Sequence, residues 1–128
     1  MEHPVLNPLP HELMEKVLNM VAAEYLHACL KHPYYADTVL PDCVTVGIAQ
    51  GELHNLRVML KDQIAAGKVN AATVIYCELY EAFEALKLHD RTAFVTEVSQ
   101  VMATVIRMLQ LGVQEIHDWE ERQKVEEV

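Results

Sequence analysis

The chain contains few aromatic, glycine and proline residues. Aromatics make up 6% of its 128 residues, and there are only 4 glycines and 5 prolines. Hydrophobic residues nevertheless account for 52% of the sequence. Alanine, leucine, valine, methionine and glutamate dominate it, and these residues suit packed helices better than sheets. A chain of this length forms one domain and can bury a core, so the composition predicts an all-α fold.

Basic residues are also scarce. The chain has 10 lysines and arginines against 19 aspartates and glutamates, for a formal net charge of −9. A protein that binds nucleic-acid polymers needs a basic face to neutralise phosphates, so this class is disfavoured. A single nucleotide is still compatible with the composition, because a bound metal ion can offset its charge.

The three cysteines show no CxxC spacing, and their number is odd. Free thiols in a reducing compartment are the simplest interpretation. The N-terminus has no signal-peptide pattern, and no apolar run is long enough to span a bilayer. The sequence therefore predicts a cytoplasmic protein with no membrane partner.

Apolar residues recur at helical spacing in four segments. We expect a four-helix bundle-like domain over residues 11–112, preceded by an extended arm at 1–10 and followed by a C-terminal helix or tail at 113–128. Pro33 ends the first helix. The helices are predicted at 11–30, 46–66, 71–88 and 91–111.

Capping residues mark several of these boundaries. Gly67 is a natural C-terminal cap, while Asn70 and Asp90 are good N-caps for the third and fourth helices. Gly112 is predicted to stop the fourth helix. The link at 88–90 is so short that the helices on either side of it must be antiparallel neighbours.

Acidic residues at helical spacing lie on both sides of this link. Glu78 and Glu81 are three residues apart on one helix, and Glu97 and Gln100 are three apart on the next, so each pair shares a helix face. Glu84 is predicted to point to solvent. Packed side by side, the two helices can bring three carboxylates and one amide together. Clustered carboxylates repel each other unless a cation lies between them, and Mg²⁺ prefers such oxygen ligands.

Three other interpretations of the sequence remain open. The glutamates can be ordinary solvated residues, because glutamate is a strong helix former. The chain can be a non-catalytic helical interaction module that forms oligomers through its apolar faces. It can also be a di-iron carboxylate bundle, but these proteins use the ExxH spacing twice, and here Glu24 and His27 form the only instance.

The segment VIYCELYEAFEAL, followed by TEVSQVMATVIRML, resembles the core of the MazG-like, all-α nucleoside triphosphate pyrophosphohydrolases. Glu78 and Glu81 match the ExxE helix of that family, and Glu97 matches the first acid of its ExxD helix. Gln100 falls at the aspartate position, and Cys77 stands where many relatives have an additional glutamate. The resemblance covers residues 70–112, about a third of the chain.

The resemblance implies Mg²⁺-dependent cleavage of an NTP or dNTP into a nucleoside monophosphate and pyrophosphate, with Mn²⁺ as a possible substitute. Glu78, Glu81 and Glu97 would be catalytic metal ligands, with Gln100 as a weaker fourth ligand. A neutral ligand at that position implies either altered metal use or a family member that has lost catalysis. The family also implies a homodimer or homotetramer.

The remaining candidates for substrate contact come from position alone. Glu52 is a possible fourth acid on the second helix. The phosphate-contact candidates are Lys61, Lys68 and Arg91.

Overall fold

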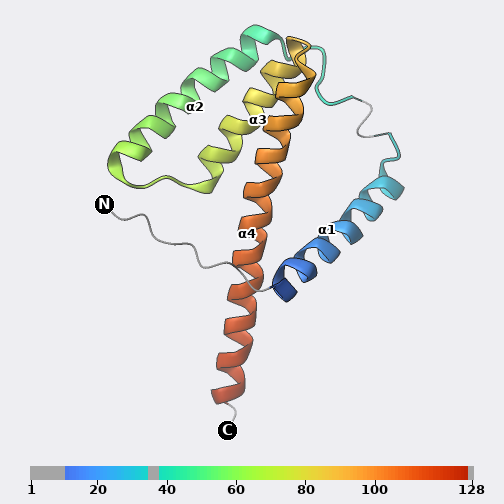
Figure 1. Cartoon of the computed structure of the whole chain (residues 1–128), viewed down its shortest axis with the longest axis vertical. Coiled ribbons are helices and arrows are strands. Elements are labelled where there is room, and N and C mark those ends of the chain that lie inside the picture. Colours follow the sequence, from blue (N-terminus) through green and yellow to red (C-terminus); the bar gives the residue numbers. More distant parts are fainter. Residues whose placement is uncertain (1–10, 35–37, 127–128) are drawn as a thin grey trace. The chain divides into compact units, whose positions relative to one another are not determined.

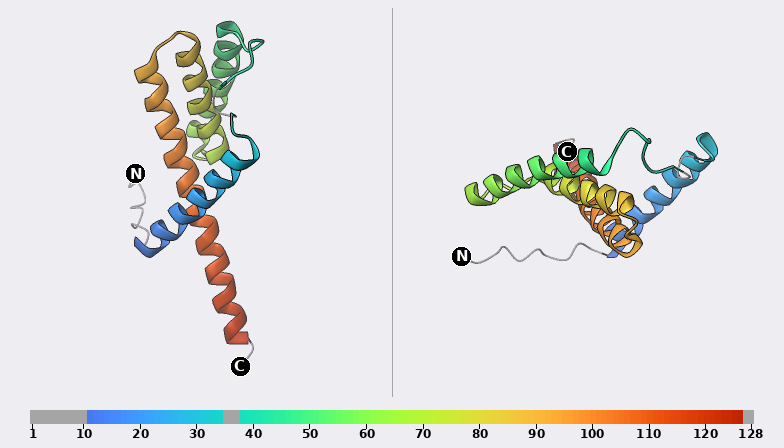
Figure 2. Two further views of the ribbon diagram at one scale, coloured as in Figure 1. Left: turned by 90° about the vertical axis from the view of Figure 1, so that its right-hand side faces the viewer. Right: turned by 90° about the horizontal axis from the view of Figure 1, so that it is seen from above.

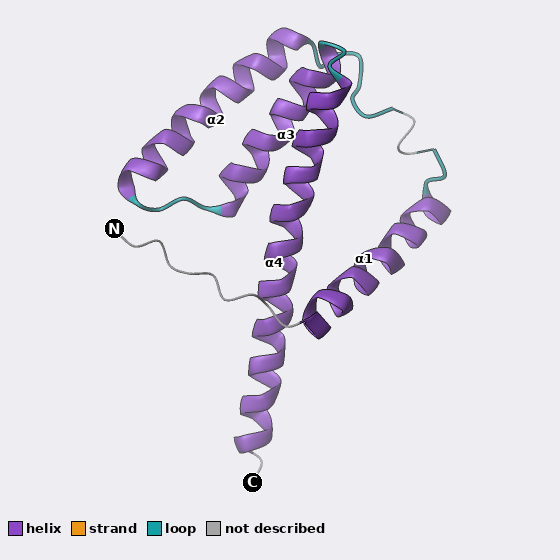
Figure 3. Cartoon of the chain, viewed as in Figure 1, coloured by secondary structure: helices purple, strands orange, loops and turns teal. Residues whose placement is uncertain are grey.

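The computed structural model describes residues 11–34 and 38–126, so the predicted arm at 1–10 lies outside the described residues. The described ranges contain four helices and no strand (Figure 3). The predicted all-α fold is confirmed. None of the helices in these ranges combines the length and apolar character of a membrane span. The helices are α1 (His11–Lys31), α2 (Val46–Ala66), α3 (Ala71–Lys87) and α4 (Arg91–Glu126).

The described residues divide into two compact units. One unit comprises 38–106 and holds α2, α3 and the first part of α4; the other comprises 11–34 and 107–126. Within the first unit, α3 lies between α2 and the beginning of α4 (Figure 1, Figure 2). Sequence neighbours are therefore also neighbours in space, as the short connections require.

Local capping defines the ends of α2, α3 and α4. Thr45 Oγ1 accepts a hydrogen bond from Ile48 N at 3.2 Å, and Asn70 Oδ1 accepts one from Thr73 N at 2.9 Å. Asp90 Oδ1 accepts one from Ala93 N at 3.1 Å. Gly67 has a left-handed φ of 68° beyond the end of α2. The caps predicted at Gly67, Asn70 and Asp90 are confirmed, and each occupies a backbone position that favours its residue type.

The predicted end of α4 at Gly112 is wrong. The helix continues through Gly112 to Glu126 over 36 residues, so residues 113–126 extend α4 instead of forming a separate tail. An interior glycine costs a helix only about 1 kcal/mol relative to alanine. The glutamine, glutamate, arginine and lysine residues that follow favour the helical state and compensate for that cost.

The connection between α3 and α4 is a tight left-handed turn. His89 has a φ of 59°, a conformation usually taken by glycine. The backbone amide of Asp90 donates to the Ala85 carbonyl at 2.9 Å, and that of His89 donates to Leu86 at 3.2 Å. These bonds satisfy carbonyls that the end of α3 would otherwise leave without partners.

Small side chains form the most buried face of α3. Cys77, Ala82 and Ala85 are buried on this helix, and Ala49 and Leu53 are buried on α2. The larger apolar residues of α3 are only half-buried: Ile75, Leu79, Phe83 and Leu86. Because Glu78 and Glu81 share the face of Cys77, Ala82 and Ala85, the helix turns its acidic residues inward.

Candidate functional site

Two carboxyl groups from neighbouring helices meet within the unit 38–106. Glu81 comes from α3 and Glu97 from α4. Burial, a hydrogen bond with the Glu81 carboxyl group and the negative charges of Glu81 and Glu78 raise the pKa of Glu97 to about 7, while Arg57 acts in the opposite direction. The sequence prediction that these carboxylates converge holds for this pair.

One oxygen of Glu97 lacks a hydrogen-bond partner in the part of the chain that the structure describes. Its Oε2 atom is buried and forms no hydrogen bond with the residues that the structure describes. A buried polar atom without a partner costs roughly 1–3 kcal/mol, and more when it is charged. A proton or a cation at this oxygen would relieve that cost.

Glu78 lies one helical turn before Glu81 and contacts α4 through a different residue. Thr104 Oγ1 donates to Glu78 Oε2 at 3.5 Å, and the same hydroxyl also lies 3.2 Å from the Gln100 carbonyl oxygen. Burial raises the pKa of Glu78; the hydrogen bond from Thr104 opposes the shift, and the charge of Glu81 adds to it. Three acidic side chains therefore influence one another across the α3–α4 interface.

A cation from α2 completes the cluster. Arg57 Nη2 lies 3.4 Å from Glu81 Oε1, and the two side chains are 57% and 30% exposed. Arg57 is absent from the candidates predicted from the sequence, because it lies 24 residues from Glu81 and belongs to a different helix. Nothing in the local spacing on α2 points to that contact.

Beside this ion pair is a cavity of about 340 Å³. Its acidic lining includes Glu84, which is half-buried, so the expectation that Glu84 points to solvent is wrong. Glu84 follows Glu81 by three residues and therefore shares its side of α3. The cavity is lined by Arg57, Glu81, Glu84, Ala85, Leu88, Asp90, Ala93 and Glu97.

Cys77 is buried on the same face of α3. Burial, followed by the charge of Glu81, raises the pKa of its thiol, while Arg57 opposes the shift. The thiol therefore stays protonated near neutral pH, which makes Cys77 a packing residue and not a nucleophile.

Several candidates from the sequence lie outside the cavity. The Gln100 side chain is exposed, and only its backbone carbonyl contacts Thr104. Glu24 and His27, which raised the di-iron alternative, are exposed on α1. The four substrate-contact candidates are also exposed and do not line the cavity: Glu52, Lys61, Lys68 and Arg91.

The donor chemistry of the cluster suits a hard divalent cation. Glu97 supplies a buried oxygen that no described residue hydrogen-bonds, and Glu78 and Glu81 supply carboxylates that repel Glu97. In the described residues, no three His, Cys, Asp or Glu side chains are placed to hold a metal ion together. Joint ligation by the three glutamates therefore requires at least one of these side chains to rotate.

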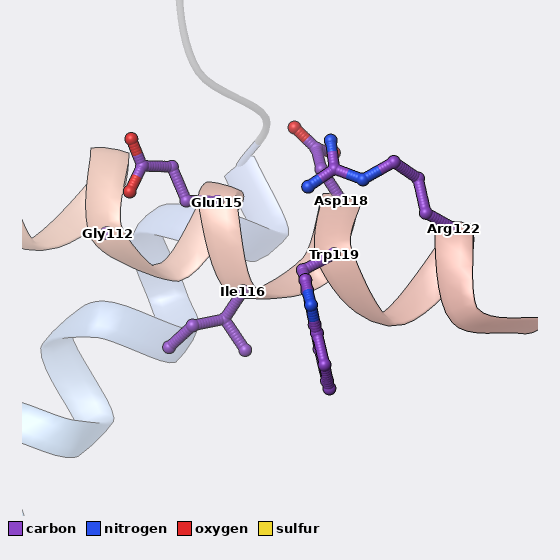
Figure 4. Close-up of a pocket in the computed structure, with 6 residues that line it drawn as sticks. All are labelled: Gly112, Glu115, Ile116, Asp118, Trp119 and Arg122. Atoms are coloured by element: carbon purple, nitrogen blue, oxygen red, sulfur yellow. The ribbon is translucent and has the colours of Figure 1, made fainter.

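The other unit contains a shallow hollow along α4 (Figure 4). Ile116 and Trp119 supply its apolar part, and Glu115, Asp118 and Arg122 supply charges of both signs. All of its lining residues come from one helix, so the hollow is a feature of the α4 surface.

No family model, curated protein or solved structure matches this chain.

Proposed function

We propose that the unit 38–106 is the catalytic part of a Mg²⁺-dependent nucleoside triphosphate pyrophosphohydrolase of the MazG-like type. The observation that carries this proposal is the inward-facing Glu97, which lies beside Glu81 and whose Oε2 is buried and has no hydrogen-bond partner among the described residues. Solvated surface glutamates would not leave a carboxyl oxygen in this position. The type of reaction is inferred from the resemblance of residues 70–112 to that family.

Glu78, Glu81 and Glu97 would hold the metal ion, Mg²⁺ or Mn²⁺. When bound, the metal would supply positive charge to the phosphate oxygens. A water oxygen would form a bond to the α-phosphorus as the bond from that phosphorus to the α–β bridging oxygen breaks. The products are a nucleoside monophosphate and pyrophosphate. One of these carboxylates would also accept the proton that the water loses.

An oligomer, either a homodimer or a homotetramer, is part of the proposal. In the single chain, α1 leaves many large apolar side chains exposed, among them Leu18, Leu26 and Leu30. On α4, Ile116 and Trp119 are 60% and 55% exposed. Monomeric soluble proteins rarely expose large apolar areas, so such areas usually mark surfaces that bind another molecule. The cysteines of the described chain are free, which agrees with a proposed cytoplasmic location.

The same exposed side chains favour a second candidate, a non-catalytic oligomeric interaction module. In that case the acidic cluster would only connect α2, α3 and α4 through Arg57 and Glu81. The two candidates differ in one measurable property, since a module of this kind has no metal-dependent turnover.

Pyrophosphate release from a panel of NTPs and dNTPs, with Mg²⁺ or with Mn²⁺, tests the proposal. Glu78→Ala and Glu97→Ala should abolish release while the circular dichroism signal stays helical. Glu120→Ala, an exposed acid on α4, is the matched control and should retain activity. The absence of release from every nucleotide in the panel would favour the interaction module.

Gln100→Asp tests the fourth ligand predicted from the sequence. If Gln100 turns toward the metal, the added carboxylate should tighten Mg²⁺ binding, as measured by calorimetry. An unchanged Mg²⁺ affinity would remove Gln100 from the ligand set while leaving the three glutamates in place.

A further inference from the structure

The charge of the cavity beside Glu97 is unfavourable for an anionic substrate. Four acidic residues line it: Glu81, Glu84, Asp90 and Glu97. A triphosphate also carries several negative charges, and one divalent cation offsets only part of the total. A second positive group is therefore needed wherever the phosphates bind.

Arg57 is the one cationic residue that lines this cavity in the described part of the chain. Its side chain is 57% exposed, and its contact with Glu81 engages Nη2 at 3.4 Å, which is long for a charge-assisted hydrogen bond. No other hydrogen bond of the guanidinium group joins it to the described residues. A guanidinium group has five N–H donors, so most of them remain available to a ligand.

We propose that Arg57 is a phosphate-binding residue of this site and that Glu81 holds its guanidinium group at the cavity before the substrate arrives. The inference rests on the proposed function and assigns a role to a residue that is absent from the sequence-based candidates. Arginine binds phosphate oxygens through two parallel N–H bonds, which also orients the phosphate chain. Lys61, Lys68 and Arg91 do not line the cavity and therefore lack this placement.

Calorimetric binding of inorganic triphosphate in the presence of Mg²⁺ to the full chain tests this role. Arg57→Met should weaken binding by about 10- to 100-fold, the loss expected for hydrogen bonds to a charged group. Arg57→Lys retains the charge without the paired donors and should lie between Arg57→Met and the wild type. Arg122→Met is the matched control, because it removes an exposed arginine of α4 in the other unit, and it should bind within twofold of the wild type.

Binding of Mn²⁺ alone separates a phosphate contact from general damage to the site. Arg57→Met should bind Mn²⁺ at least as tightly as the wild type, since a competing cation has been removed from Glu81. In turnover, Arg57→Met should raise KM for the nucleotide. Because an exposed ion pair contributes little to stability, the variant should unfold close to the wild-type temperature.

Each failure has a distinct signature. If the wild type releases pyrophosphate while Arg57→Met retains its triphosphate affinity and KM, Arg57 is not a phosphate-binding residue and the proposed function stands. Weaker Mn²⁺ binding by Arg57→Met would indicate that Arg57 positions the glutamates, and it would overturn the proposed phosphate-binding role of Arg57. If the wild type neither binds triphosphate nor releases pyrophosphate, both proposals fail.

Discussion

Replacing Glu97 by glutamine should stabilise the metal-free protein at alkaline pH. The substitution retains the shape of the side chain and removes the charge beside Glu81. The pKa of Glu97 is raised from 4.5 to about 7 in the folded protein. At about 1.4 kcal/mol per pKa unit, this shift sets an upper limit of about 3–4 kcal/mol on the cost of ionising Glu97 in the folded state. Glu97 is half-buried, and solvent screening reduces the expected gain to about 1–3 kcal/mol.

The direction of the pKa shift determines the pH range in which Glu97→Gln should be more stable than the wild type. Below pH 4.5, Glu97 is protonated in both the folded and the unfolded chain, and the substitution changes little. Between pH 4.5 and 7 the folded chain binds more protons at Glu97 than the unfolded chain does. The contribution of Glu97 to the free energy of unfolding therefore falls as the pH rises. Above pH 7 the full cost is present in the wild type and absent from Glu97→Gln.

Urea unfolding at pH 4.5 and pH 8, in the presence of a chelator and followed by circular dichroism, measures this difference. Glu97→Gln should unfold at a higher urea concentration than the wild type at pH 8 and at a similar concentration at pH 4.5. Glu120→Gln removes an exposed acid from the same helix and controls for net charge. If Glu97→Gln is no more stable than the wild type at pH 8, the argument that Glu97 is buried beside Glu81 is refuted.

Three further predictions concern the proposed metal site and the helix caps. The rise in Tm that Mn²⁺ causes in the wild type should be larger at pH 8 than at pH 6, because Glu97 must lose its proton to bind a cation. A rise in Tm that does not depend on pH would contradict a role for Glu97 as a metal ligand. Gly67→Ala should cost about 1 kcal/mol because φ is 68° there, whereas Gly51→Ala inside α2 should stabilise by up to about 1 kcal/mol; equal effects in urea unfolding would refute this assignment. Asn70→Ala should cost about 1 kcal/mol by removing the acceptor for Thr73 N and Oγ1, and Asn70→Asp should preserve most of the stability; a loss of the same size in both variants would argue against the cap.

The parts of the fold that local chemistry determines could be predicted from the sequence. Asn70, Asp90 and Gly67 act on backbone groups a few residues away, and each was predicted in its observed capping role. Gly112 was misjudged because a glycine ends a helix only when the following residues favour another conformation. The residues after Gly112 favour a helix, so α4 continues.

The candidate site shows the same division between local and long-range information. The positions of Glu78, Glu81 and Glu97 follow from helical spacing and the short link, and the structure brings Glu81 and Glu97 together. The placement of Arg57 depends on how α2 packs, and that of Glu84 depends on which face of α3 turns inward. Small residues such as Cys77 and Ala85 form that buried face. A prediction based on large apolar side chains does not identify it.

The tight turn at His89 has a consequence for folding kinetics. It closes the α3–α4 hairpin with very little loop entropy, and such local contacts form early in folding. We therefore expect Glu81 and Glu97 to be brought together when the hairpin closes, while the rest of the chain can still be open. The folding transition state would then already contain the repulsion between these carboxylates, so acidity or a divalent cation would act on the folding rate as well as on the finished protein.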